Sequence, residues 1–175
     1  MREPVIIDAV RTPVGRSRGA LRTIRPDELY AGLISEMLKR TGIGGEKIDD
    51  VITGCVTQYG EQGANVGRLA VLLSPLPSSV PAVTLNRMCG SSQHAVHFAA
   101  QSITSGDALY ILAGGVESMT RVPMFSDIKG GLENLNPGIG EKYELIHQGE
   151  SAERIADKYS LREETSSTGT ASTAI

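Results

Sequence analysis

The chain has 175 residues, of which 40% are hydrophobic and 21% are charged, and its formal net charge is −3. Such a composition is typical of a globular protein with a buried core, made of one domain or of one domain and part of another. The negative charge argues against nucleic acid or an anionic membrane surface as a partner, and the apolar runs are too short to span a membrane.

Two features of the sequence bear on the compartment. The two cysteines, Cys55 and Cys89, are too few and too far apart for a disulfide framework, so we expect free thiols in a reducing, cytoplasmic setting. The first residues run directly into an apolar stretch without a basic segment and a cleavage site, so we also expect no signal peptide.

Strand-like and helix-like patterns alternate from the start of the chain. Residues 4–10 (PVIIDAV) predict a short strand, and a turn-rich basic loop follows them. An amphipathic helix is expected to begin at Pro26, because proline and the acidic residues after it suit a first helical turn. Gly42 is expected to end this helix.

The alternation continues as far as residue 119. Helices are expected to begin near Asn65 and directly after Cys89, and three further strands are expected at 49–58, 81–88 and 108–117. The order βαβαβαβ predicts an α/β fold with a mostly parallel sheet, right-handed crossovers and helices on both faces.

The pattern changes after residue 119. Residues 120–164 are rich in glycine and proline at first and read as the start of an inserted substructure, with a short helix near 151–159. Residues 165–175 are mostly serine and threonine, cannot bury a helix face, and are expected to be poorly ordered. We therefore predict three regions, 1–119, 120–164 and 165–175.

Cys89 is the principal candidate for chemistry. It is predicted to lie where a strand passes into a helix, so that the first N–H groups and the positive end of the helix dipole face its sulfur and favour the nucleophilic thiolate. Gly90 and the two serines after it would let a substrate approach, and the Cys89 N–H could donate to an oxyanion. The residues by themselves leave open the alternative of a small buried cysteine.

Other reactive residues are assigned structural roles. His94 and His97 lie on the same predicted helix as Cys89, but their angle and rise along that helix prevent either from reaching the thiol as a base or as a fellow metal ligand. Cys55 lies inside a strand pattern and is expected to be packed in the core. The segment LAGGVES lacks the spacing of a dinucleotide loop. The basic cluster of Arg16, Arg18, Arg22 and Arg25 could be solvated, face a subunit or contact a phosphate.

Several segments taken together resemble one enzyme family. NRMCGSSQHAVHFAAQSI and AGGVESMTRVP, with AVRTPVGR before them and GESAERIADKYSLREE after them, are similar to the thiolases, which include acetyl-CoA acetyltransferases and 3-ketoacyl-CoA thiolases. The resemblance covers residues 4 to about 164. It implies the N-terminal α/β half of a thiolase fold, with 120–164 as the start of the family's loop domain.

The resemblance also implies a chemistry. Cys89 matches the acyl-accepting nucleophile, and His147 and Gln148 lie where the loop domain reaches the pantetheine of coenzyme A. Acyl-CoA and CoA would be substrates in fatty-acid metabolism, with no further cofactor or metal, and the full-length parent would be a homodimer or homotetramer. Glu117 and Met119 are expected to be structural and to pack close to the cysteine.

The chain departs from the family in length and in its missing motifs. Thiolases are about twice as long, and we find neither the activating Gly-His-Pro histidine nor the second catalytic cysteine of a Cys-x-Gly-Gly-Gly segment. The sheet elements that follow the loop domain are also missing. We therefore expect an N-terminal thiolase fragment that lacks what turnover requires. The alternative to an acyltransferase is an inactive fragment that serves as a packing or dimerisation module.

Overall fold

The structure is a computed structural model and describes residues 2–161. It divides into two compact units, Met1–Asp127 and Ile128–Ile175, each of which is described by itself. The first unit extends beyond residue 119, and within it Arg121 forms an ion pair with Glu61. The serine- and threonine-rich region 165–175 lies outside the described residues.

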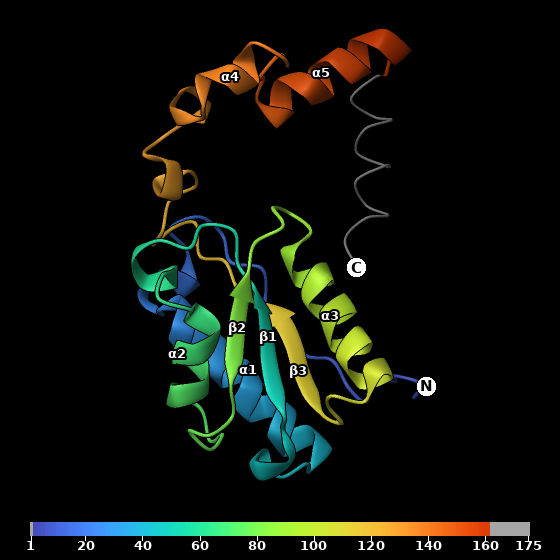
Figure 1. The fold of residues 1–175 in the computed structure, drawn as a ribbon. Helices are drawn as coiled ribbons and strands as arrows, with labels where there is room; N and C mark the ends of the chain where they lie inside the picture. The colour runs from blue at the N-terminus through green and yellow to red at the C-terminus, as the bar shows by residue number, and fades with distance from the viewer. Residues whose placement is uncertain (1, 162–175) are drawn as a thin grey trace. The chain divides into compact units, whose positions relative to one another are not determined.

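A parallel sheet forms the centre of the first unit (Figure 1). Within the described residues it has three strands in the order β2-β1-β3, namely β1 (Asp50–Gly54), β2 (Ala82–Leu85) and β3 (Ile111–Gly115). The central strand pairs on both sides, so that Val51 lies opposite Ala82 of β2 and Leu112 of β3. The predicted α/β class with a parallel sheet is confirmed, although each strand is shorter than its sequence pattern.

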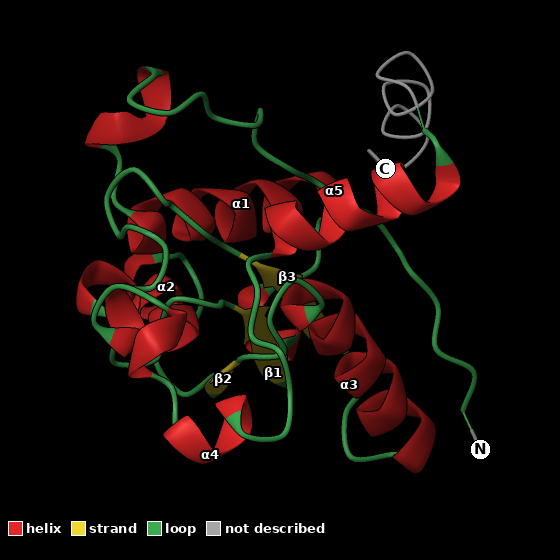
Figure 2. Ribbon diagram, turned by 90° about the horizontal axis from the view of Figure 1, so that it is seen from above, coloured by secondary structure: helices red, strands yellow, loops and turns green. Residues whose placement is uncertain are grey.

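Helices cover both faces of this sheet, as Figure 2 shows from above. They are α1 (Pro26–Thr41), α2 (Val66–Leu73) and α3 (Ser91–Ser105). Val51 of β1 packs in a core with α1 and α2, whereas the next residue, Ile52, packs against Ala95 and Ala99 of α3. Since neighbouring side chains in a strand point to opposite faces, β1 contributes to two cores at once.

The first helix begins and ends at the residues that the sequence indicated. Pro26 is its first residue, and the Arg25 N–H donates to the Glu28 carboxylate at 3.2 Å, which satisfies a backbone group at the helix start. Gly42 ends the helix with a φ of 67°, a left-handed conformation that glycine adopts without steric cost.

The expected strand at 4–10 is absent, and that prediction is wrong. The segment is extended but unpaired, and Val5 and Ile6 are 72% and 80% exposed. A cavity of about 480 Å³ lies between the segment and β3, with residues of α1 and α3 as its walls. A strand needs a partner edge for its backbone hydrogen bonds, and among the described residues β3 pairs with β1 and not with 4–10.

The remaining elements are short helices. Three 3₁₀ turns belong to the first unit, namely Ala20–Thr23, Gly45–Lys47 and Gly60–Gln62. Two more follow β3 at Ser126–Ile128 and Leu132–Asn134, and the second unit contains α4 (Pro137–Gly140) and α5 (Gln148–Tyr159). The expected helix near 151–159 is present as α5, and it begins earlier because His147 caps it.

Candidate active site at the carboxyl edge of the sheet

Two glycines form the surface on which the start of α3 lies. Gly54 ends β1 and Gly115 ends β3, and the two are paired in the sheet. A β-carbon on Gly54 would collide with the backbone of Ser91 and Ser92, and one on Gly115 would collide with the Ser92 side chain. The absence of side chains at both strand ends therefore lets the first turn of α3 approach the sheet.

Cys89 lies immediately before this first turn. Its thiol is free and exposed, Gly90 is the N-cap of α3, and Ser91 is the first helical residue. The first N–H groups of a helix have no partner within the helix, and its N-terminal end is positive. The predicted position of Cys89 at a strand-to-helix junction is confirmed, and the alternative of a buried cysteine is not.

The turn that carries Cys89 is held by side chains on both sides. Met88 has a φ of 51°, which is unusual for a residue other than glycine. The Met88 N–H donates to Asn86 Oδ1 at 2.8 Å, and the Ser91 hydroxyl donates to the Met88 carbonyl at 2.6 Å. Ser91 is buried and also accepts from the Arg87 N–H at 2.9 Å, so it braces the turn rather than opening it to a substrate.

The second cysteine lies in a different environment. Cys55 is buried directly after β1, where desolvation and the nearby Glu117 carboxylate raise the pKa of its thiol to about 12. Glu117 accepts from the Val56 N–H at 2.8 Å and from the Gln62 side chain at 2.6 Å. The prediction that Cys55 is packed in the core is confirmed, and the structural role of Glu117 becomes specific: it binds the loop after β1.

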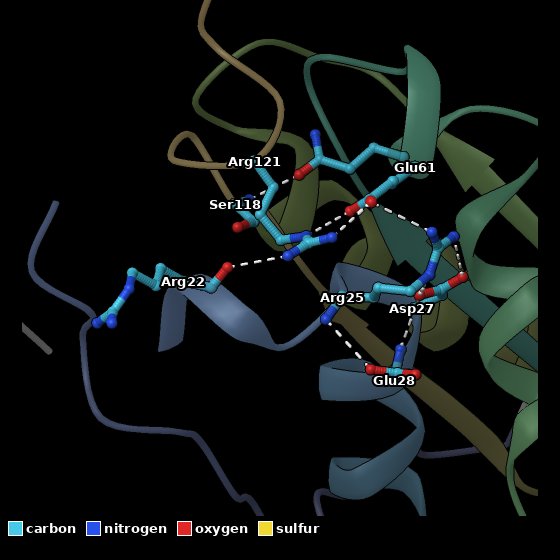
Figure 3. Close-up of polar contacts among 8 residues, drawn as sticks. Arg22, Arg25, Asp27, Glu28, Glu61, Ser118 and Arg121 are labelled. Atoms are coloured by element: carbon cyan, nitrogen blue, oxygen red, sulfur yellow. Dashed lines mark hydrogen bonds and ion pairs between the residues drawn. The ribbon is translucent and has the colours of Figure 1, made fainter. Parts of the chain in front are cut away.

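An ion-pair network also holds the loop that follows β1 (Figure 3). Glu61 pairs with Arg121 and, at 3.2 Å, with Arg25, which in turn pairs with the largely buried Asp27 at 2.9 Å. The hydrogen bond from Arg121 and the positive charge of both arginines outweigh desolvation and lower the pKa of Glu61. Arg25 of the basic cluster therefore binds carboxylates, and the loop after β1 is tied to α1 and to the segment after β3.

Neither histidine of α3 is directed to the thiol. The His94 ring packs against the Phe98 ring at 4.2 Å between centroids and lies 2.8 Å from the Arg87 guanidinium. Desolvation and the positive charge of Arg87 lower the pKa of His94. The His97 ring lies edge-on to that of His94, at 6.0 Å. These contacts agree with the expectation that a base for Cys89 does not come from its own helix.

The two predicted binding residues belong to the second unit. His147 is the N-cap of α5, and its Nδ1 accepts from the Gly149 N–H at 3.2 Å. Gln148 is the first residue of the same helix. The structure describes this unit by itself, so the binding role of His147 and Gln148 stays a prediction.

Three polar residues of the site have no signal in the sequence. Asn86, Gln62 and Glu61 act through partners that are about 30 to 60 residues away along the chain. Isolated polar residues in loops carry no local pattern that marks such contacts. Within residues 2–161 no cluster of three or more metal-binding side chains occurs, and no helix is both long and apolar enough to cross a membrane.

The chain is similar to thiolases along most of its length. It is 38% identical to a β-ketoadipyl-CoA thiolase of Acinetobacter baylyi and 41% identical to a 3-oxoadipyl-CoA/3-oxo-5,6-dehydrosuberyl-CoA thiolase of Escherichia coli, in each case over 94% of this chain and 45% of the relative. It is 49% identical to a 3-ketoacyl-CoA thiolase of Yersinia enterocolitica, over 80% of this chain and 35% of the relative. The chain thus spans less than half the length of these curated relatives.

A solved structure gives the same result for the fold. The acetyl-CoA acetyltransferase of Bacillus anthracis superimposes with a TM-score of 0.71 and 30% identity, over 87% of this chain and 41% of that one. The family described as "Thiolase, N-terminal domain" matches residues 4–168. Together with the position of Cys89, these matches show that the chain belongs to the thiolase family and represents the N-terminal part of its fold.

Proposed function

We propose that the chain supplies the nucleophilic half of an acyl-CoA acyltransferase of the thiolase type. The observation that carries this proposal is the exposed Cys89 thiol at the start of α3, seated on the paired glycines Gly54 and Gly115. A thiol in this place is open to an acyl-CoA, and the Cys89 N–H can donate to the oxyanion that forms during acyl transfer.

The reaction passes an acyl group through a thioester on Cys89, and it makes or breaks one carbon–carbon bond. The Cys89 sulfur attacks the carbonyl carbon of an acyl-CoA, the bond from that carbon to the CoA sulfur breaks, and CoA leaves as its thiol after taking a proton. In the synthetic direction the acyl group then passes to the carbanion of acetyl-CoA. In the degradative direction the Cys89 sulfur attacks C3 of a 3-ketoacyl-CoA, the C2–C3 bond breaks, and acetyl-CoA leaves after its C2 takes a proton. The sulfur of free CoA then attacks the acyl carbon, and Cys89 is released as its thiol.

His147 and Gln148 are proposed to contact the pantetheine of coenzyme A. His147 directly precedes α5 and Gln148 is its first residue, so both lie where a loop passes into a helix, and loop residues carry binding functions more often than core residues do. We further propose a cytoplasmic homodimer or homotetramer for the full-length parent.

A second candidate is an inactive module that packs or dimerises. It is favoured by the orientation of His94, which contacts Arg87 and Phe98, and by the burial and raised pKa of Cys55. The attack by Cys89 needs a group that removes the thiol proton, and condensation needs another that moves the α-carbon proton. Such acid–base groups each contribute about 10² to 10⁴-fold to the rate.

Incubation with acetyl-CoA distinguishes the two candidates. Mass spectrometry is expected to find a single acetyl group on Cys89 and none on Cys55, and a steady-state thiolysis assay with acetoacetyl-CoA is expected to find no turnover by this chain alone. Absence of acetyl-Cys89 in folded protein would favour the inactive module. Turnover that Cys89→Ala abolishes would show that a base within the chain, or within a second copy, serves the thiol.

A further inference from the structure

We propose that Asn86 is a positioning residue for the Cys89 thiol, and that its side-chain amide holds Met88 in the conformation that places Cys89 at the start of α3. The inference rests on the proposed role of Cys89 as the acyl acceptor. Asn86 lies between the last residue of β2 and the turn that carries the thiol. It touches the backbone of this turn on one side and the loop after β1 on the other.

Met88 is the residue whose conformation needs support. Its φ of 51° lies in the left-handed region, where the β-carbon of an ordinary residue approaches the backbone too closely. Met88 as a whole is 62% exposed, so packing of its side chain does little to hold the conformation. Met88 is also the residue directly before Cys89, so a change in its backbone rotates the thiol away from the helix terminus.

Hydrogen bonds fix the peptide groups on both sides of Met88. Its N–H donates to Asn86 Oδ1 at 2.8 Å, and its carbonyl accepts from the Ser91 hydroxyl at 2.6 Å. Rotation about the Met88 N–Cα bond changes the angle between these two groups, so holding both of them holds φ. Ser91 is the first residue of α3 itself, whereas Asn86 adds a hydrogen bond from the turn to the loop after β1.

The nitrogen of the Asn86 side-chain amide contacts the loop after β1, and the Glu117 carboxylate in turn holds that loop. Asn86 Nδ2 donates to the Val56 carbonyl at 3.0 Å. The Val56 N–H donates to one oxygen of Glu117 at 2.8 Å, and the Thr57 N–H donates to the other at 3.4 Å. A continuous set of contacts thus runs from Glu117 through the Val56 backbone and Asn86 to Met88, next to the thiol.

The test is a cycle of variants at Asn86 and Met88, read by the rate at which iodoacetamide alkylates Cys89 in the folded chain. Asn86→Ala removes both contacts of the amide, and Asn86→Asp keeps the acceptor for Met88 while losing the donor to Val56. Met88→Gly makes the left-handed conformation accessible without a brace. Asn65→Ala is the matched control, because Asn65 also links a strand to a left-handed turn, donating to the Ala82 carbonyl at 2.9 Å.

We expect Asn86→Ala to slow alkylation of Cys89 about ten-fold, and Asn86→Asp to slow it about three-fold, because one of two hydrogen bonds remains. In the Met88→Gly background, Asn86→Ala is expected to change the rate by less than about two-fold, since the strain that the brace opposes is gone. Asn65→Ala is expected to leave the Cys89 rate unchanged, even if it lowers the melting temperature.

Two results would overturn the inference. One is a Cys89 rate in Asn86→Ala that stays within about two-fold of the wild type. The other is an equal loss in the wild-type and Met88→Gly backgrounds, which would mean that Asn86 acts on stability and not on the conformation of Met88. If Asn86→Ala fails to fold by circular dichroism, the nearly isosteric Asn86→Asp with its Met88→Gly partner gives the same comparison. Alkylation needs no acyl-CoA, so failure of the acetylation experiment leaves this test intact.

Discussion

The two cysteines of the chain lie close to the same sheet edge and have opposite surroundings. Cys55 follows β1 into a loop that is closed by Glu117 and Gln62, and it is 1% exposed. Cys89 directly precedes the N-cap of α3 and is exposed. The comparison shows how one fold keeps one thiol inert, by burial beside a carboxylate, and presents the other at a helix terminus.

The largest expected effect on stability comes from replacing Gly54, against which the start of α3 packs. Gly54→Ala places a β-carbon against the backbone of Ser91 and Ser92, so the helix that carries Cys89 must shift. We expect the free energy of unfolding to fall by about 3 kcal/mol and Cys89 alkylation to slow as well. Denaturant unfolding and alkylation rates measure both effects.

Gly32→Ala is the control for this substitution. A β-carbon at Gly32, inside α1, meets no atom within 4 Å. The change is expected to be neutral or to stabilise by up to about 1 kcal/mol, because alanine favours a helix. Equal unfolding free energies for Gly54→Ala and the wild type would contradict the seating of α3 on the strand ends.

A smaller effect is expected on the reactivity of Cys55. Burial and the Glu117 carboxylate together raise the pKa of Cys55 to about 12, and Glu117→Gln removes the charge of that carboxylate while the burial remains. We expect Cys55 to react roughly ten-fold faster with iodoacetamide and still more slowly than Cys89. Peptide mapping after timed labelling gives both rates in one sample, and an unchanged Cys55 to Cys89 ratio would mean that burial alone protects Cys55.

The smallest expected effect is on the free energy of unfolding, when one of the ion pairs that hold the loop after β1 is removed. Burial would raise the pKa of Asp27, but hydrogen bonds from Arg25 and from the Glu28 N–H outweigh it and lower that pKa, as Arg121 does for Glu61. In the unfolded chain the pKa of an aspartate is about 3.9 and that of a glutamate about 4.3. Because folding lowers both pKa values, each group stabilises the fold at a pH above its unfolded pKa, and this stability is lost as the pH falls through its folded pKa. Asp27→Asn is expected to cost about 1 to 2 kcal/mol at neutral pH.

The pH dependence of Asp27→Asn checks the sign of this effect. The melting temperature of the wild type is expected to drop more steeply than that of Asp27→Asn as the pH falls from about 5 to about 2. Parallel curves would show that Asp27 does not take part in the acid transition. Glu36→Gln is a suitable comparison, because its exposed pair with Lys39, at 3.8 Å, is expected to contribute less than about 0.5 kcal/mol.

Local signals in the sequence were sufficient for some of these elements and not for others. The limits of α1 and the place of Cys89 depend on neighbouring residues such as Pro26, Gly42 and Gly90, so they could be predicted. The strand at 4–10 could not be judged from its own residues, because a strand also requires an edge to pair with, and in the described residues β3 pairs with β1 alone.

The hydrogen bonds that support the candidate site could not be predicted from the sequence, for a related reason. Asn86 meets Val56, and Gln62 meets Glu117, only because the strands bring their ends to one edge of the sheet. The glycines Gly54 and Gly115 were visible in the sequence, but their function depends on the approach of α3, which no local pattern indicates.

Competitive alkylation of the two cysteines tests the central claim most directly. At about pH 8, a pKa of about 12 leaves roughly one Cys55 thiol in 10⁴ as thiolate, whereas Cys89 is exposed at a helix start. In folded protein we predict that Cys89 reacts at least about 100-fold faster than Cys55, and that the difference collapses to within about three-fold in denaturant. Equal rates in the folded state, or faster reaction at Cys55, would contradict the assignment of Cys89 as the nucleophile.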